Sequence, residues 1–147
     1  MTDPESGEEL LARGRRILAG QPFSAFLGAE LARFDREDGV ELRLPMRPEF
    51  LQHHGFAHGG VLSYAADNAL TFAGGMALGG RPVLTSEFKI NYTRPGVGDT
   101  LIARAKAVYA GRTQAVATCQ IFMEKDGVET LVAVAQGTTV AVEPRAS

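Results

Sequence analysis

The sequence predicts an α+β fold in which a curled antiparallel sheet wraps around one long central helix. The segment from His58 to about Leu78 is apolar on every side except for a single acidic residue, Asp67, and a helix that is apolar all round is a buried helix. Three long strand-like segments rich in alanine follow, and their small side chains let a sheet curl around that helix. The 147 residues fit one domain, residues 1–147, with residues 58–78 as its central helix.

The other elements follow from hydrophobic periodicity and turn residues. Residues 8–19 carry leucine and isoleucine on one helical stripe, and Gly20 and Pro22 end this helix, so residues 1–22 form an N-terminal helix and tail. The expected strands are Phe26–Phe34, Val40–Met46, Val83–Thr93, Thr100–Tyr109, Thr113–Glu124 and Thr130–Val142. Hairpin turns are expected at Asp38-Gly39, Gly111-Arg112 and Asp126-Gly127.

Composition excludes several classes of function. The formal net charge is −2 and the basic residues are dispersed, whereas a nucleic-acid surface needs a basic stripe. No apolar run has the length of a membrane span, and the start MTDPESGEEL is unlike a signal peptide. The one cysteine, Cys119, forms no internal disulfide and is expected in the core. We therefore expect a cytoplasmic protein that binds neither membranes nor nucleic acids.

The glycine pair Gly59-Gly60 stands where the central helix begins. A helix N-terminus has unpaired backbone N–H groups and a partial positive charge, and glycine lets a ligand approach them closely. Such a position can hold a carbonyl oxygen that becomes negative during a reaction. The alternative is that the two glycines only relieve packing where a tight loop meets the helix.

Asp67 lies in the third turn of the same helix. A buried carboxylate needs hydrogen bonds or a raised pKa, and Ser63 and Thr71, one turn away on either side, share its face. Asp67 is either a functional acid or a structural one. At 1.5 Å of rise per residue, Asp67 and Gly59 are roughly 10–12 Å apart along the axis. One carbonyl group cannot touch both within one chain, so a site built from both predicts a dimer of antiparallel helices.

The histidines allow two interpretations. His58 could be a general base, but a positional role that fixes the glycine turn is the more usual one in such a loop. His53 and His54 are weaker candidates for a base. The three residues lack the spacing of metal ligands and no acidic or cysteine cluster accompanies them, so no metal site is expected.

The stretch QHHGFAHGG, residues 52–60, followed by Asp67, resembles the hot-dog-fold thioesterases, specifically the phenylacetate-pathway or PaaI-like group. The segment TSEFKINYTRPGVGD, residues 85–99, and the ending AQGTTVAV resemble the same group, so the resemblance extends over roughly residues 27–142. The HGG motif with an acid nine residues after its histidine is fairly specific for the family and not for a substrate. The resemblance implies the hot-dog fold, which matches the helix-in-a-curled-sheet prediction.

The resemblance implies a role for each matching position. A backbone N–H at Gly59 would hold the thioester carbonyl, and Asp67 of the neighbouring subunit would act as nucleophile or as general base on water. Gln52 stands where the group commonly has asparagine, placed to orient water or the acyl group. The chain therefore departs from the group's pattern at Gln52 and matches it at Asp67. Hydroxyls one turn after the acid and on the following strand also match, at Thr71 and Thr85.

Thr85 raises a geometric difficulty. The alternation of its strand puts Thr85 on the face opposite Phe88, away from the helix, and turns Ser86 inward. Either a bulge returns Thr85 to the helix, or Thr85 reaches a neighbouring subunit.

The substrate handle implied by the resemblance is coenzyme A or a carrier-protein phosphopantetheine. Gly60 at the helix start is a candidate for contact with it, and the phosphates of CoA need basic residues. The candidates near strand ends are Lys89, Arg94, Arg112 and Arg81, each of which could equally be a solvated charge. No cofactor is expected, since CoA is part of the substrate.

The leading hypothesis is an acyl-CoA thioesterase that hydrolyses an aromatic or medium-chain acyl-CoA to the acid and CoA. A homodimer that shares its active sites is expected, and the resemblance implies a homotetramer built from two dimers. One alternative is a non-catalytic acyl-CoA or lipid-binding hot-dog domain. The other is a hydratase or dehydratase, which would pair His58 with Asp67, although nine residues of helix place these two on opposite faces.

Overall fold

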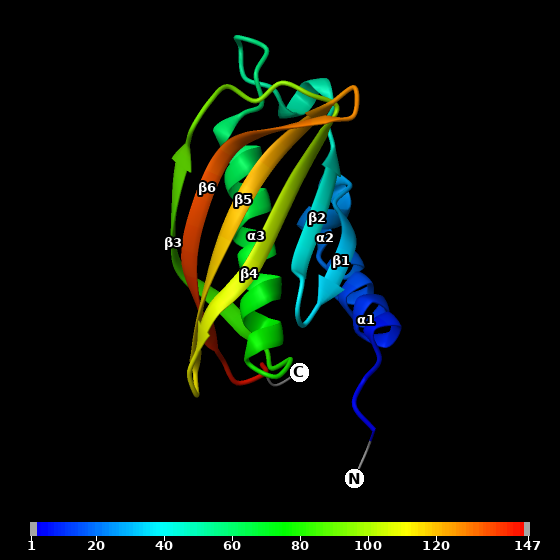
Figure 1. Cartoon of the computed structure of the whole chain (residues 1–147), viewed down its shortest axis with the longest axis vertical. Helices are drawn as coiled ribbons and strands as arrows, with labels where there is room; N and C mark the ends of the chain where they lie inside the picture. Colours follow the sequence, from blue (N-terminus) through cyan, green and yellow to red (C-terminus); the bar gives the residue numbers. More distant parts are fainter. Residues whose placement is uncertain (1–2, 146–147) are drawn as a thin grey trace.

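The computed structural model describes residues 3–145, and its long central helix lies within a curved antiparallel sheet (Figure 1). The helices are α1 (Gly7–Ala19), α2 (Pro22–Leu27), the 3-10 turn η1 (Pro48–Phe50) and the central helix α3 (Gly59–Ala77). The strands are β1 (Glu30–Asp35), β2 (Gly39–Pro45), β3 (Val83–Tyr92), β4 (Thr100–Ala110), β5 (Gln114–Lys125) and β6 (Val128–Ala141). The predicted fold class is confirmed.

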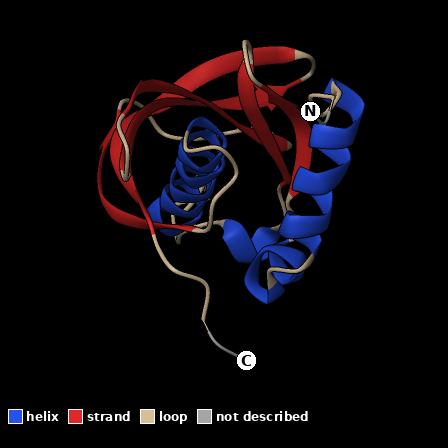
Figure 2. Cartoon of the chain, turned by 90° about the horizontal axis from the view of Figure 1, so that it is seen from below, coloured by secondary structure: helices blue, strands red, loops and turns tan. Residues whose placement is uncertain are grey.

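The six strands form one sheet in the order β1-β2-β4-β5-β6-β3, and every neighbouring pair is antiparallel. An end-on view shows the sheet curling around α3, with α1 packed outside the β1 end of the sheet (Figure 2). The chain leaves β2 through the loop before α3 and returns to the far edge of the sheet as β3. The two edge strands are therefore β1 and β3.

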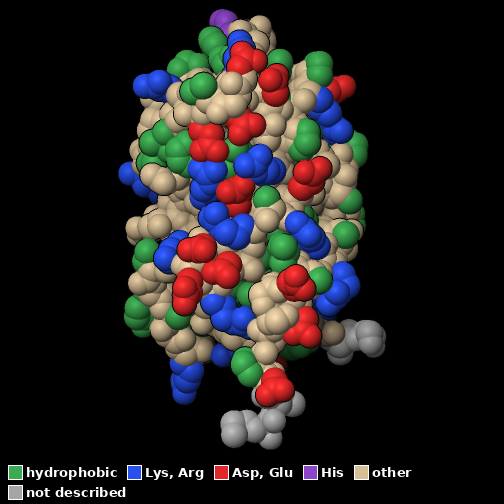
Figure 3. Space-filling model, turned by 45° about the vertical axis from the view of Figure 1, so that its right-hand side comes forward, with side chains coloured by type: hydrophobic (Ala, Val, Ile, Leu, Met, Phe, Trp, Pro, Cys, Tyr) green, Lys and Arg blue, Asp and Glu red, His purple; other side chains and the backbone are tan. Residues whose placement is uncertain are grey.

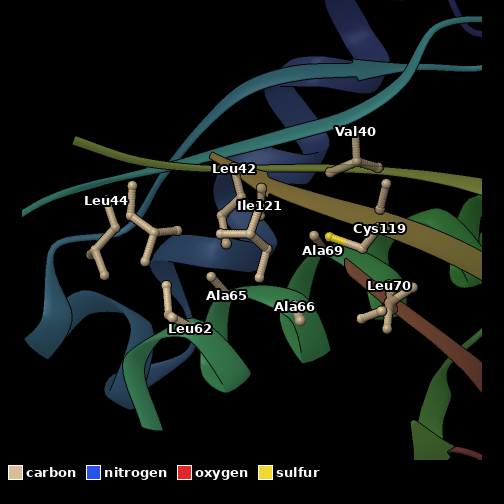
Figure 4. Close-up of a cluster of buried hydrophobic side chains, with 14 of the residues drawn as sticks. Val40, Leu42, Leu44, Leu62, Ala65, Ala66, Ala69, Leu70, Cys119 and Ile121 are labelled. Atoms are coloured by element: carbon tan, nitrogen blue, oxygen red, sulfur yellow. The ribbon is translucent and has the colours of Figure 1, made fainter. Parts of the chain in front are cut away.

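The core lies between α3 and the concave face of the sheet. Alternate residues of β2 point inward, as Val40, Leu42 and Leu44 do, and meet small residues of α3 (Figure 4). Alanines occupy the inward positions of the neighbouring strands, and these small side chains let the sheet approach the helix as predicted. Cys119 belongs to this core, where burial raises the pKa of its thiol to about 12. It remains a neutral packing residue.

The predicted strand Phe26–Phe34 is wrong in its first half. Pro22 occupies the first turn of α2, where its fixed φ and missing N–H suit a helix start. Gly28 ends α2 in the left-handed conformation, with a φ of 83°. Strand β1 begins only at Glu30, because the chain must turn after Gly28 to reach the sheet edge.

The expectation that α3 is buried all round also needs correction. Ser63, Asp67 and Thr71 recur every fourth residue and are only half-buried, and Tyr64 and Asn68 flank them in the same state. The buried residues of α3, which lie between Val61 and Gly74, face the core and the sheet. A polar stripe therefore runs along the side of α3 that the strands leave partly open.

The outer face of the sheet carries acidic and basic side chains interspersed with one another (Figure 3). Its centre is Glu41, which accepts hydrogen bonds from Arg43 at 2.7 Å and Arg104 at 2.9 Å. Burial alone would raise the pKa of Glu41, but these two guanidinium groups outweigh it and the pKa is lowered. Arg104 also binds Glu129 through two nitrogens, each at 2.7 Å. The network ties β2, β4 and β6 together across the sheet.

Thr139 offers a test of packing between β6 and α3. It is 1% exposed, and within residues 3–145 its hydroxyl oxygen has no hydrogen-bond partner. An unpaired buried hydroxyl is costly, so Thr139→Val is expected to raise the free energy of unfolding by about 1 kcal/mol. Thr138→Val is the control, because it removes a hydroxyl that donates to Glu87 at 2.6 Å. Denaturant unfolding that shows Thr139→Val less stable than the wild type would contradict this prediction.

Candidate active site

The start of α3 leaves one of its two glycine N–H groups free. His58 is the N-cap residue, and its Nδ1 accepts the N–H of Gly60 at 2.8 Å. The N–H of Gly59 has no acceptor within residues 3–145. Of the two glycines expected near the substrate, Gly59 thus offers a donor, whereas the N–H of Gly60 is already used. His58 thus holds the glycine turn through this N–H.

Tyr92 is a residue that the sequence reasoning missed. Its hydroxyl donates to the carbonyl oxygen of Gly59 at 3.0 Å and shares a hydrogen bond of 2.7 Å with the hydroxyl of Ser63. The peptide between Gly59 and Gly60 is therefore held at both ends, by Tyr92 at its oxygen and by His58 at its N–H. The inward face shared by Tyr92 and Ile90 was the available signal, but nothing in the sequence indicated its partner.

Asp67 lies on the half-buried stripe of α3, and its carboxylate is held by the hydroxyl of Thr85. Thr85 Oγ1 donates to Asp67 Oδ1 at 2.6 Å. Thr71 Oγ1 donates to the backbone carbonyl oxygen of Asp67 at 2.7 Å and lies 3.5 Å from Oδ1. The two threonine hydroxyls are 2.8 Å apart. Thr71 therefore reaches the carboxylate mainly through Thr85, and the Ser63 hydroxyl is paired with Tyr92. The carboxylate oxygen is thus fixed in position while the residue remains partly open to solvent.

A β-bulge explains why Thr85 faces the helix. In the ladder with β6, Thr85 pairs with Thr139 and Glu87 pairs with Thr138, so Ser86 is the extra residue. The bulge reverses the alternation, and Thr85 and Phe88 both point inward while Ser86 is exposed. The expectation that Thr85 points away from the helix and Ser86 inward is wrong, and the bulge is the alternative that holds.

Gln52 lies in the loop before α3 and braces that loop. Its side-chain oxygen accepts the N–H of His54. Gln52 and Gly59 line a cleft of about 380 Å³ together with Tyr92 and Arg94. Arg94 is thus brought to the glycine end of α3. Lys89 and Arg112 do not line this cleft. Lys89 is exposed on β3. The carbonyl oxygen of Arg112, in the turn between β4 and β5, accepts a hydrogen bond from Arg81 at 2.8 Å.

The free N–H of Gly59 and the carboxylate of Asp67 lie about two turns apart along α3. Gly59 begins the helix, and Asp67 follows eight residues later, which corresponds to about 12 Å of rise. Gly59 belongs to the cleft beside Gln52, whereas the neighbours of Asp67 are Thr71 and Thr85. A single chain does not bring the free N–H and the carboxylate together.

Within residues 3–145, none of the helices combines the length and apolarity that a membrane span requires.

Comparisons with known proteins show the family of the chain. The family model described as thioesterase superfamily matches residues 54–130. A thioesterase family protein from Silicibacter pomeroyi is 34% identical, covering 87% of this chain and 94% of that one, with a TM-score of 0.76. A mutant phenylacetic acid degradation protein PaaI from Thermus thermophilus is 28% identical, covering 83% and 100%, with a TM-score of 0.70.

A Bacillus halodurans protein solved with CoA is 29% identical, covering 90% of this chain and 83% of that one, with a TM-score of 0.67. A search of curated proteins gave no match. The matched residues include the glycine pair, Asp67 and Thr85. The chain belongs to the thioesterase superfamily, and it is a thioester hydrolase with the hot-dog fold.

Proposed function

We propose that this protein hydrolyses acyl-CoA thioesters that carry an aromatic or medium-chain acyl group, at a site shared between two subunits. The observation that carries the proposal is the Asp67 carboxylate, held by Thr85 at 2.6 Å on the open stripe of α3. A single carboxylate held by a hydroxyl on the partly open side of a helix is an arrangement suited to chemistry. The free N–H of Gly59 supplies the complementary donor for a carbonyl oxygen.

In the proposed reaction, the thioester oxygen accepts the Gly59 N–H, which stabilises the negative charge that develops on it. Asp67 of the other subunit either attacks the carbonyl carbon or takes a proton from the attacking water. The C–S bond breaks, CoA leaves as the thiol, and water supplies the hydroxyl of the acid. Gln52, at the edge of the Gly59 cleft, is placed to orient water or the acyl group.

The CoA portion is assigned to the cleft that contains Gly59. Arg94 lines this cleft and carries a charge suited to a phosphate. The similarity to the Bacillus halodurans protein solved with CoA supports the choice of CoA as the handle. The proposal does not place Lys89 or Arg112 at the CoA portion, because neither lines the cleft. It does not use Gly60 as a donor, because the Gly60 N–H is already bonded to His58.

The separation of Gly59 and Asp67 along α3 supports a dimer. Two antiparallel copies of the helix would place the carboxylate of each opposite the glycine of the other. Strand β3 is an edge of the sheet, and Leu84 and Tyr92 on it are 64% and 52% exposed. An unpaired edge with exposed apolar side chains is suited to pairing with a second copy. A tetramer would then pair two such dimers.

Tyr92 is proposed as a positioning residue for the Gly59 peptide. Tyr92→Phe removes the hydroxyl that binds the Gly59 carbonyl oxygen and is expected to lower kcat about tenfold while KM changes little. Steady-state kinetics on one acyl-CoA measure this split. The control is Tyr109→Phe on β4, because Tyr109 is also exposed but lies outside the cleft. A rise in KM with unchanged kcat would contradict a positioning role.

Hydrolysis of a panel of acyl-CoA thioesters tests the proposed function. The panel contains phenylacetyl-, benzoyl-, butyryl-, octanoyl- and palmitoyl-CoA, and release of free CoA thiol is measured. Turnover of the aromatic or medium-chain members is expected. Binding of acyl-CoA in calorimetry without turnover would instead favour a non-catalytic domain. Hydration of an enoyl-CoA without hydrolysis would favour a hydratase.

A further inference from the structure

A cavity of about 340 Å³ lies between α1 and the C-terminal half of α3. Its wall is largely apolar, with Ile17 from α1, Phe72 and Met76 from α3, and Val83 at the start of β3. This volume is in the range of small-molecule sites. The cavity is distinct from the cleft at Gly59, because the two share no lining residue.

The cavity reaches the carboxylate through one residue. Thr71 lines it, and the same Thr71 hydroxyl is bonded to Thr85 at 2.8 Å beside Asp67. Thr71 follows Asp67 by one helical turn, so the cavity begins about 6 Å from the acid. It extends from there along α3 away from Gly59 of the same chain, toward Met76.

We propose that this cavity receives the acyl group of the thioester, so that α1 and the C-terminal half of α3 determine acyl length. The inference rests on the proposed function, and it adds which part of the chain selects the substrate. A thioester carbonyl at Asp67 has the CoA on one side and the acyl group on the other. Asp67 does not itself line the cavity, but Asn68, the next residue, and Thr71, one turn further along α3, do.

A polar network holds the wall of the cavity in place. Ser24 of α2 accepts a hydrogen bond from Tyr64 at 2.6 Å and from Asn68 at 3.2 Å, and donates to Gln21 at 2.6 Å. Ser24 is only 2% exposed, so these bonds are shielded from water. They fix α2, and with it the end of α1, against α3. The space beneath α1 is therefore a preformed feature of the fold.

The chemistry of the wall defines the class of acyl group. Arg13 at the rim is paired with Glu5, with nitrogen–oxygen distances of 2.9 and 3.0 Å, so its charge is already compensated. Arg81 also lines the cavity, and its guanidinium donates to the carbonyl oxygen of Arg112 at 2.8 Å. The apolar side chains that make up most of the remaining wall favour an uncharged, mainly apolar group. At about 30 Å³ for a group the size of a water molecule, the cavity holds about ten heavy atoms. A ring-bearing or eight-to-ten-carbon acyl group matches this volume, and a sixteen-carbon chain exceeds it.

Filling the cavity from its floor gives the first test. Gly75 lines the cavity, and a Cβ at this position would meet only Val83 Cγ2, at 3.3 Å. Gly75→Leu is expected to lower the octanoyl-to-butyryl ratio of kcat/KM at least about tenfold. Ala77→Leu is the matched control, because Ala77 is exposed at the same end of α3 and does not line the cavity. Its ratio should remain that of the wild type.

Opening the cavity at its mouth gives a second test that does not depend on Gly75→Leu folding. Ile17 is 46% exposed on α1, so Ile17→Ala costs little stability. Because it removes part of the wall, it is expected to move the optimum chain length upward. An acyl-CoA series from four to sixteen carbons measures the shift.

The outcomes separate the two proposals. If the wild type hydrolyses no acyl-CoA, the proposed function and this inference both fail. If it hydrolyses them and both variants keep the wild-type chain-length profile, only the assignment of the acyl group to this cavity is overturned. Opposite shifts in Gly75→Leu and Ile17→Ala, with Ala77→Leu unchanged, are the result expected.

Discussion

Asp67→Asn is expected to lower kcat by about 10³-fold while leaving KM within a few-fold of the wild type. Asparagine retains an oxygen for the Thr85 hydroxyl, which donates to Asp67 at 2.6 Å, so the local packing should persist. It has no negative charge with which to attack a carbonyl or to accept a proton from water. Steady-state kinetics on the best acyl-CoA of the panel provide the measurement.

Two comparisons make the Asp67 result specific. Denaturant unfolding should show Asp67→Asn within about 1 kcal/mol of the wild type, since the change preserves shape. Asp126→Asn is the matched control, because Asp126 lies in the turn between β5 and β6 with a φ of 52°, which asparagine also adopts. Full activity in Asp67→Asn would remove the carboxylate from the mechanism.

Gly59→Pro is expected to lower kcat by about 10²- to 10³-fold, because proline has no N–H to donate to the carbonyl oxygen. Gly59 is the first residue of α3, where proline is well tolerated in a helix. His58 before it has an extended backbone, with φ −65° and ψ 137°, as a residue before proline requires. The substitution therefore removes one donor and leaves the helix start intact.

Gly59→Ala separates the lost N–H from the added side chain. A Cβ at this position would lie 3.1 Å from the Tyr92 hydroxyl in either variant. Alanine keeps the N–H, so it should retain activity within about tenfold of the wild type. If alanine and proline were equally inactive, crowding at Tyr92 would explain the loss and the donor role of Gly59 would fail.

The helix α3 was predictable because its signals are local. The apolar run from Val61 onward is a helix-length segment, and the glycine pair with a following acid marks its start. The hairpin between β5 and β6 follows from Asp126 and Gly127, which adopt positive φ. These features depend on neighbouring residues alone, so the sequence specifies them.

The features that could not be predicted from the sequence depend on contacts between distant segments. The bulge at Ser86 is set by the pairing of β3 with β6. Gly137 of β6 stands opposite Phe88, and a Cβ on Gly137 would lie 2.7 Å from the Cβ of Phe88, so only glycine fits there. The bond from Tyr92 to Gly59 joins residues 33 positions apart. No periodicity in either strand indicates such partners. The cavity beneath α1 likewise arises only when α1 and α3 are packed around the end of β3.

The central claim is that Asp67 of one subunit acts with Gly59 of another. Its most direct test mixes Asp67→Asn and Gly59→Pro chains, unfolds and refolds them together, and measures hydrolysis. In a random mixture half of the dimers are mixed and each has one intact site of two, so activity should recover to about one quarter of the wild type. Activity that stays at the level of the separate variants would contradict the shared site.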